Sequence, residues 1–173
     1  KNNLKIYIDK LPLNIIYIGE IFKIFPQAKF IFSIRHPCDC VLSCFMQNFA
    51  INNAMANFFN LEDSAKLYDH VMRLWTQYMS IFDINYHEIK YENLVQNLEK
   101  TIKPLIKFLE LPWNDNVLEF SKTAKKKQQI KTPSYDQVIR PLYSESSGRW
   151  KMYEKQISIT LPILESWVKK FNY

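Results

Sequence analysis

An α/β fold with parallel strands is what this sequence predicts, because short apolar runs typical of buried strands alternate with longer segments of helical periodicity. Residues 30–34 form a near-continuous run of Phe and Ile, as expected of a strand buried on both faces. From Leu61 onward apolar residues recur at steps of four and three, which predicts a long amphipathic helix. The length of 173 residues favours one domain, and no internal repeat or linker divides the chain.

The remaining elements follow from the same patterns. Asn14 is a good N-cap for an apolar helix, and Pro37 suits the first turn of another helix. The expected order is a strand at 5–8, a helix at about 15–24, a strand at 30–34, a helix at about 39–49, a loop at 51–60, a helix from 61 to about 82, a strand at 86–90, a turn at 92–95, a helix at 98–109, and helices at about 146–156 and 160–171.

Composition narrows the classes of partner. The chain has 23 Lys and Arg against 17 Asp and Glu, for a net charge of +6, which favours an anionic partner such as a nucleotide, an acidic substrate or nucleic acid. It contains only Gly19 and Gly148, so no glycine-rich phosphate loop is present, and side chains or helix N-termini must hold any phosphate. No apolar run approaches the roughly 20 residues that span a bilayer.

Cysteines gather in one short stretch, at Cys38, Cys40 and Cys44. Three thiols without a fourth Cys nearby make a poor zinc site, so we expect no metal and favour small buried thiols on a core-facing helix in a reducing compartment. The three histidines show no ligand spacing and receive no role.

Basic residues follow two of the expected strands. Lys10 comes shortly after the strand at 5–8, and Arg35 directly after the strand at 30–34. Because ligands of open parallel sheets bind outside the carboxyl ends of the strands, we expect the two cations to meet one anion. Arg35 offers a planar fork for phosphate oxygens, and Ser43, eight residues further on, can donate a hydroxyl to the same group. The alternative is that each cation reaches solvent and that Ser43 is an ordinary helical serine.

Several motifs follow one another along the chain: 9–14 (DKLPLN), 25–29 (FPQAK) leading into 34–43 (IRHPCDCVLS), 90–95 (KYENLV), 108–113 (FLELPW), 134–141 (SYDQVIRP) and 147–150 (SGRW). They resemble motifs of the sulfotransferases that use 3′-phosphoadenosine 5′-phosphosulfate (PAPS), particularly the tyrosylprotein sulfotransferases and their bacterial relatives with tetratricopeptide repeats. Each is weak alone, but in this order along residues 5–156 they form a specific signal.

The resemblance implies the family's three-layer fold, related to the P-loop NTPases, in which helices flank a central parallel sheet. It implies that Arg35 and Ser43 bind the 3′-phosphate of the donor, that Tyr91 lies against the nucleotide, and that Arg149 contacts the donor phosphates. It also implies that Lys10 and Ser134 stabilise the transferring sulfuryl group.

A covering loop is implied as well. Residues 134–143 match the segment that folds over the donor in this family, so Gln137 and Arg140 are expected to contact the nucleotide there.

Two parts of such an enzyme are not found in these residues: the 5′-phosphosulfate loop and the acceptor's general base, both expected upstream. We therefore interpret residues 1–173 as the C-terminal portion of a sulfotransferase catalytic domain, inactive by itself. An open sheet edge would favour self-association, for example as a homodimer. The acceptor would be a hydroxyl of protein tyrosine, of a carbohydrate or of a small molecule, with an acidic peptide as one option. The cytoplasm is the expected compartment, with the Golgi lumen as the alternative.

Two other functions stay open at this point. A nucleotide or sugar kinase lacks its GxxxxGK[ST] loop here. A nucleic-acid-binding module could use the basic stretch at 122–131, with Tyr135 and Tyr143 for stacking. We regard nucleic acid as the less favoured partner, because such a lysine run is commonly a solvated face.

Overall fold

Two parallel strands form the sheet in the computed structural model, which describes residues 6–119 and 145–173. Strand β1 (Phe30–Ile34) pairs with β2 (Tyr86–Lys90), and the register places Phe30 opposite Tyr86 and Ile34 opposite Lys90. The α/β class with a parallel sheet is therefore confirmed, and both strands lie where the sequence predicted them.

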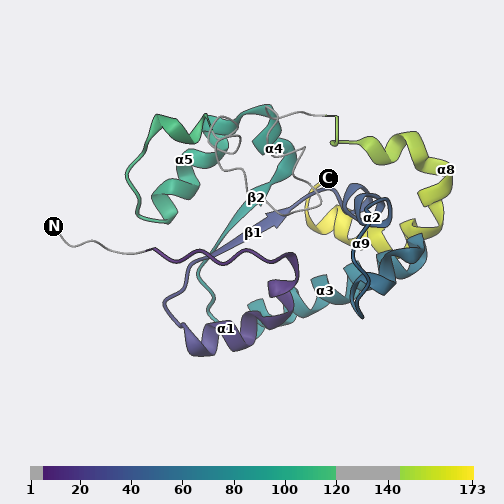
Figure 1. Ribbon diagram of the computed structural model, residues 1–173, viewed down its shortest axis with the longest axis horizontal. Coiled ribbons are helices and arrows are strands. Elements are labelled where there is room, and N and C mark those ends of the chain that lie inside the picture. Colours follow the sequence, from purple (N-terminus) through teal and green to yellow (C-terminus); the bar gives the residue numbers. More distant parts are fainter. Residues whose placement is uncertain (1–5, 120–144) are drawn as a thin grey trace.

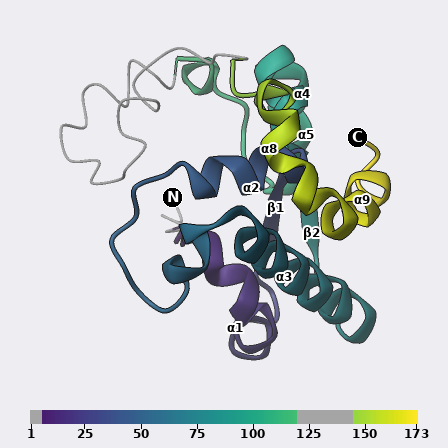
Figure 2. The same ribbon diagram turned by 90° about the vertical axis from the view of Figure 1, so that its right-hand side faces the viewer.

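Helices surround this sheet (Figures 1 and 2), with α4 and α5 on one side and α1 and α3 on the other. The α-helices are α1 (Ile18–Ile24), α2 (Pro37–Phe45), α3 (Leu61–Ile81), α4 (Tyr91–Gln96), α5 (Leu98–Phe108), α8 (Glu154–Ile157) and α9 (Leu161–Lys170). The 3-10 helices are η1 (Pro12–Tyr17), η2 (Met55–Phe59), η3 (Asp115–Val117), η4 (Arg149–Tyr153) and η5 (Ser158–Thr160).

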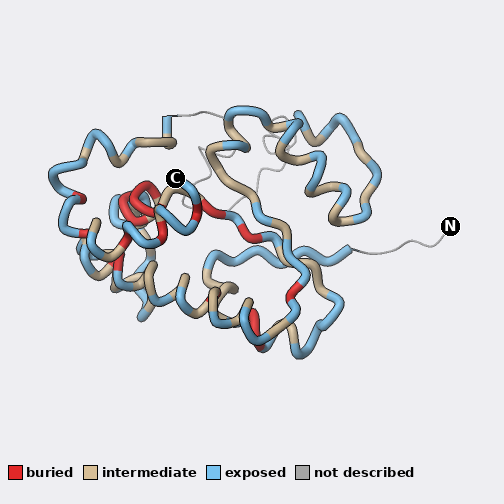
Figure 3. Tube along the Cα trace, turned by 180° about the vertical axis from the view of Figure 1, so that it is seen from behind, coloured by how far each residue is buried: buried red, intermediate tan, exposed pale blue. Residues whose placement is uncertain are grey.

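The alternation of side chains along β1 fixes which face is buried. Phe32 and Ile34 point to the face covered by α3 and α9, where the Phe32 ring stacks on Trp75 with centroids 4.2 Å apart. On the other face of the sheet, His87 of β2 stacks on Phe108 of α5. Such aromatic pairs add to the free energy of burial. A second core joins α2, α3 and α9, and Figure 3 shows the buried residues along β1 and around these helices.

Gly19 permits a close contact between α1 and α3. A Cβ atom at Gly19 would lie 2.8 Å from the Tyr78 ring, whose hydroxyl donates to the Ile16 carbonyl at 2.8 Å. Only glycine leaves room for this approach.

Three local predictions are wrong. Residues 6–8 do not form a strand; they are exposed and pair with neither β1 nor β2, and a strand needs a partner for its backbone hydrogen bonds. Asn14 does not cap α1, because η1 precedes that helix and the Asn14 amide donates to Asp9 instead. Residues 92–95 continue as α4 rather than forming a turn.

Candidate functional site

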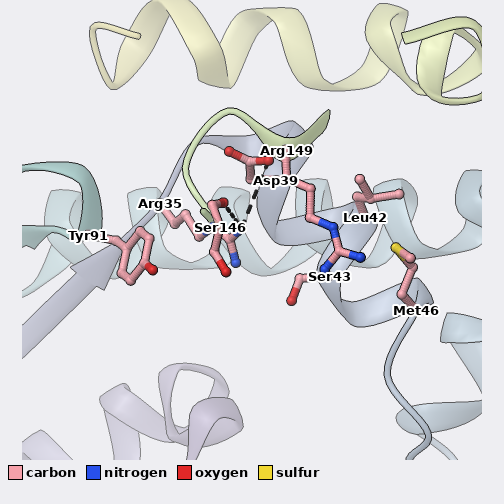
Figure 4. Close-up of a pocket in the computed structure, with 8 residues that line it drawn as sticks. All are labelled: Arg35, Asp39, Leu42, Ser43, Met46, Tyr91, Ser146 and Arg149. Carbon is pink, nitrogen blue, oxygen red and sulfur yellow. Dashed lines mark hydrogen bonds and ion pairs between the residues drawn. The ribbon is translucent and has the colours of Figure 1, made fainter. Parts of the chain in front are cut away.

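A polar pocket of about 110 Å³ lies at the carboxyl ends of the two strands (Figure 4). Arg35 directly follows β1, and Tyr91 directly follows β2, so the parallel register brings these two side chains together. The Arg35 guanidinium carbon lies 5.2 Å from the centre of the Tyr91 ring. The residues that line the pocket are Arg35, Asp39, Leu42, Ser43, Met46, Tyr91, Ser146 and Arg149.

The guanidinium of Arg35 is only partly satisfied by protein groups. Its side chain is 20% exposed, its Nη2 donates to the Ser146 carbonyl, and the same atom lies 3.9 Å from Asp39 Oδ1. The Arg35 Nε is buried, and no described residue accepts its hydrogen. A buried donor without an acceptor is unfavourable, so an anionic oxygen in the pocket would stabilise this arrangement.

One face of α2 supplies most of the other lining residues. Asp39, Leu42, Ser43 and Met46 recur at helical spacing after Arg35, which explains why residues eight positions apart share one pocket. Pro37 occupies the first turn of α2, as predicted. The helix is nevertheless shorter than expected, since it ends at Phe45.

The first N–H groups near α2 have protein acceptors already. The His36 N–H donates to Glu92 Oε1 at 2.9 Å, and the Cys38 N–H donates to His36 Nδ1 at 3.2 Å. A helix N-terminus was one of the two kinds of phosphate-binding group expected from the sequence, but these two N–H groups are not free to bind a ligand. The positive charge available to an anion comes instead from guanidinium groups.

Burial lowers the pKa of His36 below its ordinary value of 6.5, although the carboxylates of Asp39 and Glu92 act in the opposite direction. A neutral imidazole is required here, because Nδ1 accepts a hydrogen bond. His36 also stacks on Trp150, with ring centroids 5.0 Å apart. His36 therefore does not line the pocket but packs behind it, between α2 and Trp150.

Arg149 reaches the pocket from the C-terminal part of the chain (Figure 4). It begins η4, and the preceding Gly148 has φ 72°, a left-handed conformation that glycine adopts without strain. Two guanidinium groups, those of Arg35 and Arg149, and one carboxylate, that of Asp39, line the pocket, which leaves an excess of positive charge. Arg35, Ser43, Tyr91 and Arg149, all singled out from the sequence, lie around this one pocket.

Asp39 and Ser146 also line the pocket, although neither was expected to do so from the sequence. The signal for Asp39 was present, because a residue four positions after Arg35 on a helix shares its face. No sequence signal identified Ser146, since it contributes its backbone carbonyl.

Lys10 is exposed, in a segment without regular secondary structure, and is not among the residues that line this pocket. Its role remains a prediction. Ser134, Gln137 and Arg140, like the basic stretch at 122–131, lie outside the described residues.

Within residues 6–119 and 145–173, no group of three or more His, Cys, Asp or Glu side chains could hold a metal ion. Cys38 is buried on α2, where desolvation raises the pKa of its thiol to about 11.

Among the described residues, no helix combines the length and the apolar character that a bilayer-spanning segment needs.

Comparisons with known proteins show which proteins this chain resembles in sequence. A relative from Aquifex aeolicus, described as an uncharacterized protein, is 35% identical over 166 residues, which cover 95% of this chain and 21% of the relative. The protein-tyrosine sulfotransferase of Drosophila melanogaster is 27% identical over 82% of this chain and 29% of its own length. Protein-tyrosine sulfotransferase 1 of Danio rerio is 29% identical over 82% of this chain and 41% of its own length.

The chain thus spans less than half the length of each of these relatives. The sequence profile of the sulfotransferase family matches residues 1–115, well over half of the 173 residues. This chain belongs to the sulfotransferase family.

Proposed function

We propose that the protein transfers a sulfuryl group from PAPS to a hydroxyl acceptor, and that the pocket around Arg35 binds the 3′-phosphate of this donor. The observation that carries the proposal is the buried Arg35 Nε, which no described residue satisfies, in a pocket that Ser43 and Arg149 also line. A guanidinium fork, a hydroxyl and a second guanidinium are the donors that a phosphate prefers.

Each residue has a physical task in this proposal. Arg35 and Ser43 donate hydrogen bonds to the 3′-phosphate, Arg149 adds positive charge, and Tyr91 lies against the nucleotide. The donor supplies an activated sulfuryl group, and charge develops on the sulfuryl oxygens and the leaving phosphate during an in-line transfer. Lys10 and Ser134 would stabilise that charge, and such preorganised electrostatics is commonly the largest part of catalysis.

Among hydroxyl acceptors we favour protein tyrosine over a carbohydrate, because the relatives from Drosophila melanogaster and Danio rerio are named protein-tyrosine sulfotransferases. Competition between a tyrosine peptide and a sugar tests this choice in a protein that also carries the 5′-phosphosulfate loop and the general base expected upstream. Preferential sulfation of the sugar would contradict it.

Calorimetric titration tests the donor site directly. We expect 3′,5′-adenosine bisphosphate to bind more tightly than 5′-AMP, which lacks the 3′-phosphate. Arg35→Ala should weaken the bisphosphate by at least about 30-fold, since truncating a buried, hydrogen-bonded charge commonly costs ~2–5 kcal/mol. Arg73→Ala is the matched control, because Arg73 lies on α3 and pairs with Asp69 away from the pocket. Equal affinity for the two nucleotides, or bisphosphate binding unchanged by Arg35→Ala, would contradict the proposal.

A further inference from the structure

Asp39 is the most deeply buried charged residue of the donor pocket. Asp39 is 1% exposed, and both of its carboxylate oxygens accept backbone hydrogen bonds from a distant part of the chain. Oδ2 accepts from the Gly148 N–H at 2.6 Å, and Oδ1 accepts from the Trp150 N–H at 2.8 Å. These donors lie 109 and 111 residues further along the sequence. Burial of a carboxylate is favourable only when its oxygens have hydrogen-bond donors. The two oxygens of Asp39 therefore hold the 146–150 turn in one position.

The turn that Asp39 holds is the turn that carries Arg149. Arg149 lies between the two residues whose N–H groups Asp39 accepts, so both neighbours of its backbone are fixed to α2. Two further contacts connect the same segments: the Ser146 carbonyl accepts from Arg35, and Trp150 stacks on His36. The residues after β1 and the segment 146–150 therefore form one unit.

Resting on the donor site proposed above, we infer that Asp39 is a positioning residue: it fixes the 146–150 turn on α2 and thereby places the Arg149 guanidinium at the 3′-phosphate. Asp39 itself does not contact the donor in this arrangement, because both of its oxygens are engaged by backbone N–H groups.

A competing role for Asp39 is that of a counter-charge to Arg35. The Nη2–Oδ1 distance of 3.9 Å is longer than a hydrogen bond, and the same Nη2 donates to Ser146 instead. The two roles predict opposite signs. If Asp39 only offsets positive charge, its neutralisation should strengthen anion binding; if it positions Arg149, neutralisation should weaken it.

Titration of the Asp39→Asn protein separates these roles. The Asn side chain has an NH₂ group in place of one carboxylate oxygen, so one of the two backbone N–H groups would face a donor instead of an acceptor. We expect the Kd for 3′,5′-adenosine bisphosphate to rise about tenfold or more, the effect of losing a hydrogen bond to a charged group. The Kd for 5′-AMP should change less than about twofold. In the Asp39→Asn background, Arg149→Ala should have little further effect, because coupled residues are not additive.

A matched control and a second variant guard against a purely structural effect. Asp69 also joins two distant segments, since it accepts from Trp167 Nε1 at 2.8 Å, but it does not line the pocket. Asp69→Asn should lower the melting temperature without changing selectivity between the two nucleotides. Gly148→Ala strains the same turn at φ 72° without altering any charge, and it should also weaken the bisphosphate.

The outcomes are distinct. Bisphosphate binding that is unchanged or tighter in Asp39→Asn, while Arg35→Ala still abolishes it, would overturn the positioning role and leave the donor site intact. Full additivity of Asp39→Asn and Arg149→Ala would also overturn it. If the Asp39→Asn protein does not fold, the Gly148→Ala protein provides the test, and an unchanged affinity of that protein for the bisphosphate would overturn the inference. A wild-type protein that shows no Arg35-dependent binding would overturn the donor site and this inference together.

Discussion

The regions around Arg35 and Lys10 were expected to bind opposite ends of the donor, but they differ in how many contacts fix their side chains. Residues 35–46, together with 146–150, form a pocket wall in which a buried carboxylate, an aromatic stack and backbone hydrogen bonds fix the side chains. Residues 6–11, which include Lys10, are exposed and have no regular secondary structure. Contacts between distant segments therefore hold the first region in place, whereas the second region resembles the family in its sequence motif alone.

A sequence motif predicts the position of a side chain only where other segments of the fold pack against it. Both regions carry family-like residues in the right order, but only the pocket wall has neighbours that fix its geometry among the described residues. A strand motif such as that at 5–8 requires a pairing strand, and local propensity does not replace one. Variants in one region should therefore change stability, catalysis or binding differently from variants in the other region.

The largest contrast is expected in stability. Trp75→Ala should reduce the free energy of unfolding by about 3–5 kcal/mol, because the ring is 5% exposed and stacks on Phe32. Ile8→Ala should change it by less than about 0.5 kcal/mol, since Ile8 is 85% exposed. Urea denaturation measures both values, and an equal loss in the two variants would contradict the contrast.

Catalysis should reveal the task of the exposed region. Lys10→Ala is expected to lower kcat by about 100- to 1,000-fold, the usual effect of removing one group that stabilises transition-state charge. Because Lys10 does not line the Arg35 pocket, affinity for 3′,5′-adenosine bisphosphate should remain within about twofold. Sulfate-transfer kinetics and calorimetry check this in a protein that also carries the 5′-phosphosulfate loop and the general base expected upstream, with Lys23→Ala, on α1, as control. A parallel loss of kcat and affinity would remove Lys10 from the catalytic role.

Arg149→Ala should affect binding and not stability. Loss of one charge-assisted hydrogen bond costs about 1.5–3 kcal/mol, so the Kd for the bisphosphate should rise about 10- to 150-fold. The melting temperature without ligand should stay unchanged, because Arg149 is exposed. Lys169→Ala on α9 provides a surface control, because the Lys169 cation pairs with Glu165. Wild-type affinity in Arg149→Ala would show that the turn carries no binding group.

The smallest expected effect is a pH dependence of the pocket wall. Because burial lowers the pKa of His36, the unfolded chain takes up a proton before the folded chain as the pH falls. The stability that depends on neutral His36 is therefore present above about pH 6.5 and is lost below it. His36→Asn keeps an acceptor for the Cys38 N–H but does not titrate, so its melting temperature should fall less between pH 7 and 5. His70→Gln, at an exposed residue of α3, should follow the wild type, and identical slopes in all three proteins would contradict the effect.

Much of the site could be predicted from the sequence, because it follows directly from local patterns. Arg35 and Tyr91 were found because they come after recognisable strands, and Ser43 because its helical spacing and the family likeness agree. Local spacing could place Asp39 near Arg35, but its contact with residues more than a hundred positions away, which gives it a role, is encoded in no local pattern. The position of Lys10 could not be predicted either, since a strand at 5–8 requires a pairing strand, and residues 6–8 pair with neither β1 nor β2.

A crystal structure with bound 3′,5′-adenosine bisphosphate tests the central claim most directly. The account predicts the 3′-phosphate within hydrogen-bonding distance of Arg35 Nε and the Ser43 hydroxyl, with the guanidinium of Arg149 facing the same phosphate and the 146–150 turn still fixed to Asp39. A 3′-phosphate bound away from Arg35, with its Nε still lacking an acceptor, would contradict it.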